Sequence, residues 1–386
     1  MLDIPPIEKE LNACTACGDC DLVCPGYQEI PGDDASPMFR VLQLRKYDRR
    51  NLRDLAFRRT VKINERFARS VYICTACGMC EEVCPVDIRF SSLWDTVKAW
   101  LVEKGFEPIS EHRQTCENVL RNHNILGEPH EKRGDWMAGA DVKQAEYPDI
   151  VFWVGCMQSY RQPQVATAVV KLLNAAGVKY RILGTDEWCS GSPLLRLGYQ
   201  AMVKKELMQH NFTAIAGTGA KAIVTACAEC YRTFIRDYRE LGGAPPFVVH
   251  HITEYVNMLV KTRKLKFGTK IEKKATYHDP CLLGRHCGYY EPPRDSLKLV
   301  PGLERLEMDA NQKNALCSGA GGGFPQAFPK QALNVAFRRL EQAKKTGANL
   351  LLTSCPFAKE RFQEAAQKKS GGLETKDITE ILADAL

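Results

Sequence analysis

The hydrophobic pattern of the chain changes near residue 147. From there on, short apolar runs that suit buried strands alternate with longer stretches that carry apolar residues at helical spacing. The segment YPDIVFWVGC (147–156) predicts a strand, and QVATAVVKLLNAAG (164–177) predicts a helix. Further strands are expected in KAIVTACAEC (221–230), FVVHH (247–251), KKATYHDPC (273–281) and ANLLLTSC (348–355). Strands that alternate with helices indicate α/β units with parallel sheets.

The N-terminal part follows a different pattern. Residues 39–74 read as helix, and residues 92–138 hold another helix followed by a loop that glycine and proline interrupt. The first residues, MLDIPPIEKELNAC, lack a basic stretch followed by an apolar one, and no apolar run is long enough to cross a bilayer. We therefore expect a cytoplasmic protein, or one held on the cytoplasmic membrane through a partner.

The 386 residues suffice for two or three domains, and a hydrophobic fraction of 45% provides for a normal core. Seventeen cysteines are present, an odd number in a chain without a secretion signal. In a reducing compartment this density indicates metal binding rather than disulfides.

Two cysteine runs share one pattern, C-x2-C-x2-C-x3-C-P. They read CTACGDCDLVCP (14–25) and CTACGMCEEVCP (74–85). In two-cluster ferredoxins, three thiolates of a run bind one [4Fe-4S] cluster and the fourth binds the other cluster. The expected ligand sets are Cys14, Cys17, Cys20 and Cys84 for one cluster, and Cys74, Cys77, Cys80 and Cys24 for the other. A pair of zinc knuckles is the alternative, but zinc has no need of the repeated x3-C-Pro ending.

The segment between the two runs is rich in basic residues. They are Arg45, Lys46, Arg49, Arg50, Arg53, Arg58, Arg59, Lys62, Arg66 and Arg69. Either this is a solvated helix face, or it docks an acidic partner or anionic lipid headgroups. The net charge of +7 is weak support for nucleic-acid binding, because each four-thiolate cluster adds about two negative charges. We expect no nucleic-acid partner.

The C-terminal part repeats its cysteines. Cys156, Cys189 and Cys227 stand in a first half, and Cys281, Cys317 and Cys355 stand in a second. In each half 37 residues lie between the middle cysteine and the last one, and the middle cysteine begins the tripeptide Cys-Ser-Gly. The outer cysteines follow strands, at the edge where open α/β sheets place their sites. An internal duplication with one site in each half is indicated.

This arrangement resembles the cysteine-rich "CCG" domain, present twice behind a two-cluster ferredoxin domain. It is similar to the D subunit of heterodisulfide reductase, the glycolate oxidase iron–sulfur subunit and the C subunit of anaerobic glycerol-3-phosphate dehydrogenase. The segments GEPHEKRGDWM (127–137), YHDPCLLGRHCG (277–288) and CSGAGGG (317–323) support the resemblance. Where relatives carry Cys-Cys, this chain has Ser190 and Ser318 after the middle cysteines. Serine is a poor ligand for soft metals, so both sites have lost a ligand.

Four cysteines remain for each site. The sets are Cys156, Cys189, Cys227 and Cys230 in the first half, and Cys281, Cys287, Cys317 and Cys355 in the second. Each set suits a [4Fe-4S] cluster or zinc, so one or two further clusters, or zinc, are expected. The glycine run after Cys317 does not match G-x-G-x-x-G, because Phe324 takes its last place. We read these glycines, which stand beside a candidate ligand, as allowing the backbone to approach the cluster closely.

The expected architecture is multidomain. An α-helical two-cluster ferredoxin domain (1–100) and a linker (101–146) precede two tandem α/β cysteine-rich domains with parallel sheets (147–268 and 269–386). The sequence predicts a non-catalytic electron-transfer subunit of an oxidoreductase complex, with no flavin or NAD on this chain. The resemblance implies a flavoprotein or heterodisulfide-reductase-like partner, and a quinone-reactive, membrane or second redox partner. One alternative is a thiol–disulfide reductase that acts at a cysteine-rich-domain cluster, and the other is a scaffold subunit with zinc in those domains.

Overall fold

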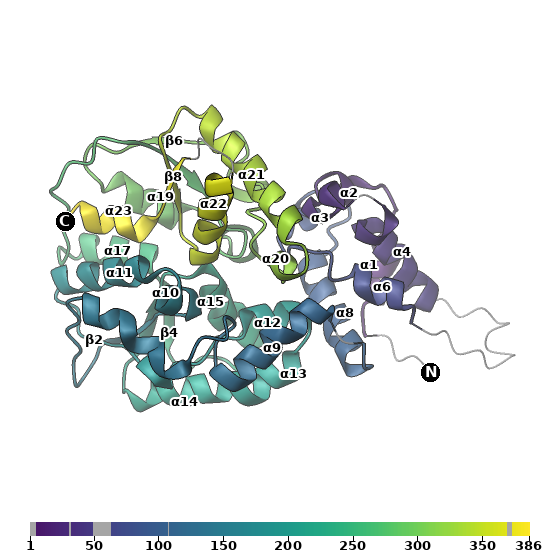
Figure 1. The fold of residues 1–386 in the computed structure, drawn as a ribbon, viewed down its shortest axis with the longest axis horizontal. Coiled ribbons are helices and arrows are strands. Elements are labelled where there is room, and N and C mark those ends of the chain that lie inside the picture. The colour runs from purple at the N-terminus through teal and green to yellow at the C-terminus, as the bar shows by residue number, and fades with distance from the viewer. Residues whose placement is uncertain (1–4, 31, 49–62, 107, 369–372) are drawn as a thin grey trace, which may run out of the picture. The chain divides into compact units, whose positions relative to one another are not determined.

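The computed structural model describes residues 5–30, 32–48, 63–106, 108–368 and 373–386 (Figure 1). The chain forms two compact units that are not continuous in sequence. Unit 1 comprises Met1–Gln114, Pro193–Gln200 and Gly319–Val335, and unit 2 comprises Thr115–Ser192, Ala201–Ser318 and Ala336–Leu386. The division by sequence into parts 1–100, 101–146, 147–268 and 269–386 stays a prediction.

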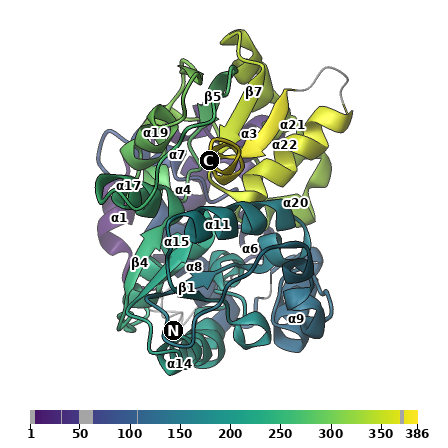
Figure 2. The ribbon, with the colours of Figure 1, turned by 90° about the vertical axis from the view of Figure 1, so that its left-hand side faces the viewer.

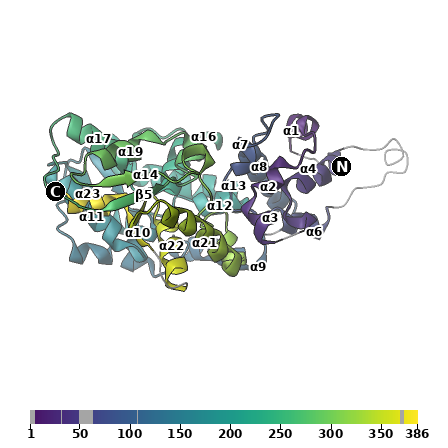
Figure 3. The same cartoon turned by 90° about the horizontal axis from the view of Figure 1, so that it is seen from above.

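Unit 1 is helical, and Figure 3 shows its helices α2, α3 and α4 close together. Its core contains Leu11, Val41, Val97 and Leu101, all fully buried. The helices are α1 (Glu8–Ala13), α2 (Asp19–Leu22), α3 (Pro25–Glu29), η1 (Asp33–Ala35), α4 (Pro37–Asp48), α6 (Glu65–Ser70), α7 (Met79–Glu82), α8 (Phe90–Glu103), α12 (Ser192–Leu197) and α20 (Phe324–Ala327). α9 (Ser110–Asn122) and α21 (Pro329–Lys345) extend into both units.

The helix expected over residues 39–74 is seen at both of its ends, as α4 and α6. Residues 49–62, with Arg49, Arg50, Arg53, Arg58, Arg59 and Lys62 of the proposed docking face, lie outside the described residues. Arg45 is described, and its guanidinium donates to the carbonyl oxygens of Leu11 and Cys14. At this position the basic residue supports the fold of unit 1, while the docking face stays a prediction.

Unit 2 contains two four-stranded parallel sheets, ordered β2-β1-β3-β4 and β6-β5-β7-β8. The strands are β1 (Ile150–Trp153), β2 (Tyr180–Arg181), β3 (Ala222–Thr225), β4 (Val248–His251), β5 (Lys274–His278), β6 (Glu304–Leu306), β7 (Leu350–Thr353) and β8 (Glu374–Asp377). All five strands expected from the sequence are present, as β1, β3, β4, β5 and β7. β1 and β7 are buried along their whole length, as parallel strands covered on both faces require.

The repeated strand order creates the same switch point in each half. β1 connects outward to β2 on one side, whereas β3 connects to β4 on the other. β5 and β7 do the same in the second sheet. The crossovers therefore diverge beyond the carboxyl ends of β1 and β3, and of β5 and β7, which is where open α/β sheets hold ligands. Cys156 and Cys227 follow the first pair of strands, and Cys281 and Cys355 follow the second.

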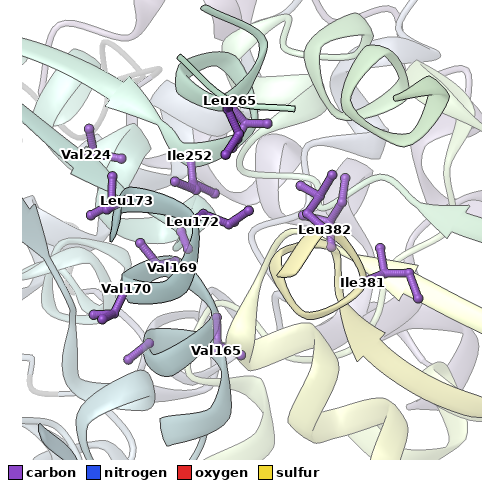
Figure 4. Packing of buried hydrophobic residues seen from close by; sticks show 14 of the residues in the cluster. Val165, Val169, Val170, Leu172, Leu173, Val224, Ile252, Leu265, Ile381 and Leu382 are labelled. Carbon is purple, nitrogen blue, oxygen red and sulfur yellow. The ribbon is translucent and has the colours of Figure 1, made fainter. Parts of the chain in front are cut away.

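Helices cover both sheets and join the two halves within unit 2 (Figure 2). Val165, Val169 and Leu172 of α11 share one core with Ile381 and Leu382 of α23 (Figure 4). The remaining helices are η2 (His130–Gly139), α10 (Cys156–Tyr160), α11 (Pro163–Ala175), η3 (Gly184–Asp186), α13 (Gln200–Met202), η4 (Val203–Met208), α14 (Gln209–Gly217), α15 (Ala228–Arg232), η5 (Thr233–Asp237), α16 (Tyr238–Glu240), α17 (Ile252–Lys261), α18 (Gly284–Cys287), α19 (Glu291–Lys298), η6 (Gln312–Asn314), α22 (Pro356–Lys368) and α23 (Ile378–Asp384).

The start of the helix after the fourth strand is also repeated. α17 begins with His251 followed by Ile-Thr-Glu, and α23 begins with Asp377 followed by Ile-Thr-Glu. The His251 ring accepts from the Thr253 backbone N–H at 3.4 Å, and the Asp377 carboxylate accepts from the Thr379 N–H at 3.0 Å. Each side chain caps its helix by satisfying a free N–H group. The duplication thus extends to the last strand–helix pair of each half.

Among the described residues, no helix combines the length and the apolar character needed to span a bilayer.

Candidate metal centres

The two N-terminal cysteine runs fold into the same turn. Ala16 has φ 60° and Ala76 has φ 53°, a region that residues with a side chain rarely adopt. Gly18 and Gly78 follow with φ 87° and 73°, and each starts a short helix, α2 or α7. The shared left-handed conformation curls each run so that its first three cysteines surround a common point.

The first predicted ligand set lines one cavity. Cys14, Cys17 and Cys20 line one space, together with Cys84 from the other run. Met38, Ile88 and Phe90 complete its walls with apolar atoms. The structure thus brings these four thiols together, with the fourth supplied by the second run. Their number and their sulfur chemistry fit a [4Fe-4S] cluster.

The second predicted ligand set also combines three cysteines of one run with the last cysteine of the other run. The pKa of Cys24 is raised to about 12, and burial is the largest cause. Negative charge on the nearby Cys74 and Cys77 contributes to the rise. The pKa of Cys80 is raised well above its usual value by burial first, then by Cys77, Cys74 and Cys24. Four crowded thiols ionise only when a cation compensates them, and iron of a cluster would supply that charge. The donor set therefore fits a second [4Fe-4S] cluster.

Polar groups of unit 1 support the second set. The Ala76 N–H donates to Cys74 Sγ at 3.3 Å, the type of bond that tunes cluster sulfurs. The buried Arg40 donates to the Ile73 carbonyl oxygen at 2.8 Å, directly before Cys74. Lys98 is also buried, and burial lowers its pKa while the charge of Cys74 opposes the shift. Two buried basic side chains thus lie beside this set.

In the first half of unit 2, all four predicted cysteines are buried. The thiols of Cys156 and Cys189 are hydrogen-bonded to each other, and those of Cys227 and Cys230 form a second pair. Cys189 and Cys230 interact electrostatically, which links the two pairs. The hydrogen bond with Cys189, as the largest cause, and the charge of Arg133 together lower the pKa of Cys156 to about 6 despite burial. The loops beyond β1 and β3, together with the first Cys-Ser-Gly motif, thus meet at the switch point.

Ser190 occupies the place of the lost ligand and makes a different contact. Its hydroxyl donates to Cys230 Sγ at 3.4 Å, and the Gly191 N–H donates to Cys189 Sγ at 3.3 Å. Ser190 is 3% exposed, so the hydroxyl is held inside the site. The serine therefore acts as a hydrogen-bond donor to a candidate ligand.

In the second half, Cys281 and Cys355 follow the paired strands β5 and β7. The pKa of Cys355 is raised well above its usual value by burial first, then by Glu229 and, more weakly, by Cys281. Cys317 is buried in the second Cys-Ser-Gly motif. Cys287 is half-buried in α18, and its thiol donates to the Leu282 carbonyl oxygen at 3.1 Å. Its role as fourth ligand stays a prediction.

The two halves of unit 2 present their cysteines to one another. The charge of Cys355 raises the pKa of Cys227, after the larger effects of Cys230 and burial. Glu229, 7% exposed, raises the pKa of both thiols. Within the described residues, no three or more Cys, His, Asp or Glu side chains gather as closely as a single metal ion would require.

Two features beside the first-half cysteines were not expected from the sequence. The Trp188 ring is sandwiched between His123 and His210, with ring centroids 3.6 Å away on both sides. A buried ion pair joins Arg133 and Glu187 at 2.5 Å. Trp188 and Glu187 stand directly before Cys189, so their position in the sequence could have identified them. No local sequence pattern marked the residues that they contact.

Comparison with known proteins supports this architecture. Residues 10–88 match the 4Fe-4S dicluster domain family, and residues 150–235 and 275–359 match the cysteine-rich domain family CCG. The chain is 37% identical over 388 residues to the D subunit of dihydromethanophenazine:CoB--CoM heterodisulfide reductase of Methanosarcina acetivorans, covering 98% of this chain and 94% of the relative.

Two further relatives show the range of the similarity. The D subunit of the same reductase from Methanosarcina mazei is 36% identical, with 98% of this chain and 94% of the relative covered. EtfAB:quinone oxidoreductase of Syntrophomonas wolfei is 28% identical, with 98% of this chain but 58% of the relative covered. The chain is an iron–sulfur protein of the family of heterodisulfide reductase D subunits, in which a dicluster ferredoxin domain precedes two cysteine-rich domains.

Proposed function

We propose that this chain relays single electrons between a flavin-containing partner and a second partner that is quinone-reactive, membrane-bound or another redox enzyme. The relatives named as subunits of reductases, and the EtfAB:quinone oxidoreductase, support this placement. Iron–sulfur clusters supply the one-electron chemistry. The chain's own residues supply thiolates, hydrogen bonds to sulfur and burial, which determine the potentials.

In this proposal each predicted cysteine set holds one centre. The sets are Cys14, Cys17, Cys20 and Cys84; Cys74, Cys77, Cys80 and Cys24; Cys156, Cys189, Cys227 and Cys230; and Cys281, Cys287, Cys317 and Cys355. [4Fe-4S] clusters in all four sets would make the chain a continuous electron carrier, whereas zinc in the last two would end conduction in unit 1.

The observation that carries the proposal is the course of the chain after each Cys-Ser-Gly motif, since both following segments belong to unit 1. After the first motif, α12 packs on α8: Arg196 pairs with Asp95 at 2.5 Å, and Lys98 Nζ donates to the Arg196 carbonyl oxygen at 2.8 Å. All of these groups lie in unit 1. The first-half cysteines are therefore tied by a short length of chain to the unit that holds the ferredoxin cysteines.

The segment after the second motif reaches the ferredoxin cysteines themselves. A Cβ atom on Gly322 would overlap the Cys74 carbonyl oxygen and come within 2.7 Å of the Thr75 carbonyl carbon. A Cβ atom on Gly321 would lie 2.8 Å from the Thr75 carbonyl oxygen. Only glycine allows this approach. The sequence did not predict this contact with the cysteine loop of the ferredoxin unit, and the close approach to a cluster that was expected from the glycine run stays a prediction.

This contact limits the length of the electron path. Gly322 follows Cys317 by five residues, and an extended chain spans at most about 3.6 Å per residue, so their Cα atoms are no more than about 18 Å apart. Tunnelling rates fall steeply with distance, so a short covalent tether favours transfer between the set containing Cys74 and the second-half set.

This route is tested by mixing the cluster-loaded chain with limiting dithionite and following the cluster signals by freeze-quench electron paramagnetic resonance. In Gly322→Ala, we expect the second-half signal to appear more slowly while the iron content stays near that of the wild type. Gly347→Ala is the matched control, because Gly347 has a similar φ of +77° but no atom within 4 Å of the added Cβ. Equal rates in both variants and the wild type would contradict transfer through this loop.

A second candidate function rests on the proximity of Cys227, Cys355 and Glu229. A disulfide bound where the two halves face each other would take up two electrons and two protons and leave as two thiols. The names of the Methanosarcina relatives support this class of substrate. The isolated, cluster-loaded chain should reduce the CoB--CoM heterodisulfide with an artificial donor only if this alternative holds. Absence of turnover with intact clusters would favour the relay.

A further inference from the structure

A buried ion pair lies beside the two chain segments that supply Cys156 and Cys189. The side chains of Arg133 and Glu187 are each 1% exposed, and Arg133 Nη2 lies 2.5 Å from Glu187 Oε1. The Glu187 carboxylate also accepts the backbone N–H groups of Val154 at 2.8 Å and Gly155 at 2.7 Å. These two residues immediately precede Cys156, and Glu187 precedes Cys189 by two positions. The carboxylate therefore fixes both approaches to the first-half site.

Arg133 extends the network to sulfur. Both terminal nitrogens of its guanidinium lie 3.9 Å from Cys156 Sγ, within reach of an N–H···S hydrogen bond. The guanidinium is shielded from water, and charges in such a buried site interact more strongly than charges at the surface. A permanent positive charge thus lies against one candidate ligand of this half.

Stability alone is a weak explanation for such a pair, because desolvating two charges offsets much of their attraction. The second half shows what a structural pair looks like. Arg294 donates to both oxygens of Asp279, at 2.6 and 2.9 Å, and to Glu307 and the Tyr290 carbonyl oxygen. Asp279 lies two residues before Cys281. The bonds described for Arg294 thus go to oxygen acceptors, whereas those of Arg133 include a sulfur.

We propose that Arg133 and Glu187 are positioning residues that set the reduction potential of the first-half centre, with Arg133 raising it by donating to Cys156 Sγ and Glu187 limiting that rise. This rests on the proposed function, since it requires a cluster on Cys156, Cys189, Cys227 and Cys230. A positive charge near a ligand sulfur stabilises the reduced cluster, which carries one additional electron. Electrons that enter the chain would then collect in the first half.

The proposal is tested by potentiometric titration of the anaerobically purified, cluster-loaded chain with dithionite. Electron paramagnetic resonance follows the signal of each cluster. Dithionite supplies one electron per cluster. The first-half signal is identified as the one that Cys189→Ala removes. Arg133→Met leaves the carboxylate without its cation, so the midpoint potential should become more negative. Glu187→Gln leaves the cation uncompensated, so the midpoint potential should become more positive. Arg133→Lys keeps the charge and should shift the potential less than Arg133→Met does.

Opposite signs separate tuning from a structural role, because damage to the fold would lower iron content or shift both variants in one direction. Arg294→Met with Asp279→Asn, the matched control, should leave the first-half potential unchanged. Unchanged or equally signed shifts with wild-type iron would overturn the proposal. If Arg133→Met fails to fold, the sign of the Glu187→Gln shift decides. If Cys189→Ala removes neither iron nor a signal, the premise of a first-half cluster fails instead.

Discussion

The two halves of unit 2 share a strand order, a switch point and a helix start, yet surround their cysteines differently. In the first half four buried thiols form two hydrogen-bonded pairs, with Ser190 and Arg133 directed at sulfur. In the second half Cys281 and Cys287 are half-buried, and Cys355 is followed three positions later by Ala358. Duplication has therefore preserved where the sites lie, while local substitutions have changed what each site offers a metal.

Removing one ligand from each half tests the comparison with the largest expected effect. Cys230→Ala should lose about 4 iron and 4 sulfide per chain if the first-half set holds a [4Fe-4S] cluster. Cys287→Ala should lose the same amount only if Cys287 completes the second-half set. Iron and acid-labile sulfide analysis measures both. Cys116→Ala is the control, because Cys116 lies outside the predicted sets, with its thiol 3.9 Å from Met202 Sδ. Full iron in Cys287→Ala would show that the second half uses fewer than four of its cysteines.

The two helix caps predict opposite responses to pH. Burial lowers the pKa of His251 to about 3, so its contribution to stability is present above pH 6.5 and is lost as the pH falls and the unfolded histidine protonates. Burial raises the pKa of Asp377 to about 7, so its contribution is present below pH 3.8 and is lost as the pH rises toward 7. Each effect is on the order of a few kcal/mol at most.

Neutral caps should remove these responses one at a time. His251→Asn should flatten the acid side of the unfolding free energy, and Asp377→Asn should flatten the fall between pH 4 and 7. Asparagine retains the capping function, so each variant changes the titration with little loss of the cap itself. Chemical denaturation at a series of pH values provides the measurement. Identical pH profiles for both variants and the wild type would exclude this difference between the halves.

The smallest effect concerns the serines. Ser190→Ala removes the donor to Cys230 Sγ, and we expect the first-half midpoint potential to become more negative and the free energy of unfolding to fall by about 1 kcal/mol. Ser190→Thr keeps the hydroxyl and serves as the control, although it adds a methyl group in a buried place. A potential that moves equally in both variants would indicate a packing effect rather than the lost hydrogen bond.

The fold followed from local patterns to a large extent. The run IVFW at 150–153 and the run LLLT at 350–353 are apolar strands between turn residues, and they form central strands of the two sheets. Strand ends that carry Cys156, Cys227, Cys281 and Cys355 then place the cysteines at the switch points. The tripeptide Ile-Thr-Glu follows both His251 and Asp377, and it is a further sequence sign of the duplication. The cysteine spacing alone does not reveal it.

Other features depend on contacts between distant segments. The packing of α12 on α8, and of Gly322 on the loop of Cys74, joins residues about a hundred or more positions apart that no local periodicity connects. Arg133 lies in the GEPHEKRGDWM segment, and its bond to Cys156 Sγ depends on a buried loop conformation. Such side-chain contacts arise from tertiary packing, which the sequence pattern alone does not specify.

The most direct test of the account is the content of iron, acid-labile sulfide and zinc per chain after anaerobic purification. The proposal that electrons cross from the ferredoxin unit into the cysteine-rich halves predicts about 12–16 iron, matching sulfide and no zinc. About 8 iron with one or two zinc would contradict it, because conduction would then end at the two ferredoxin clusters.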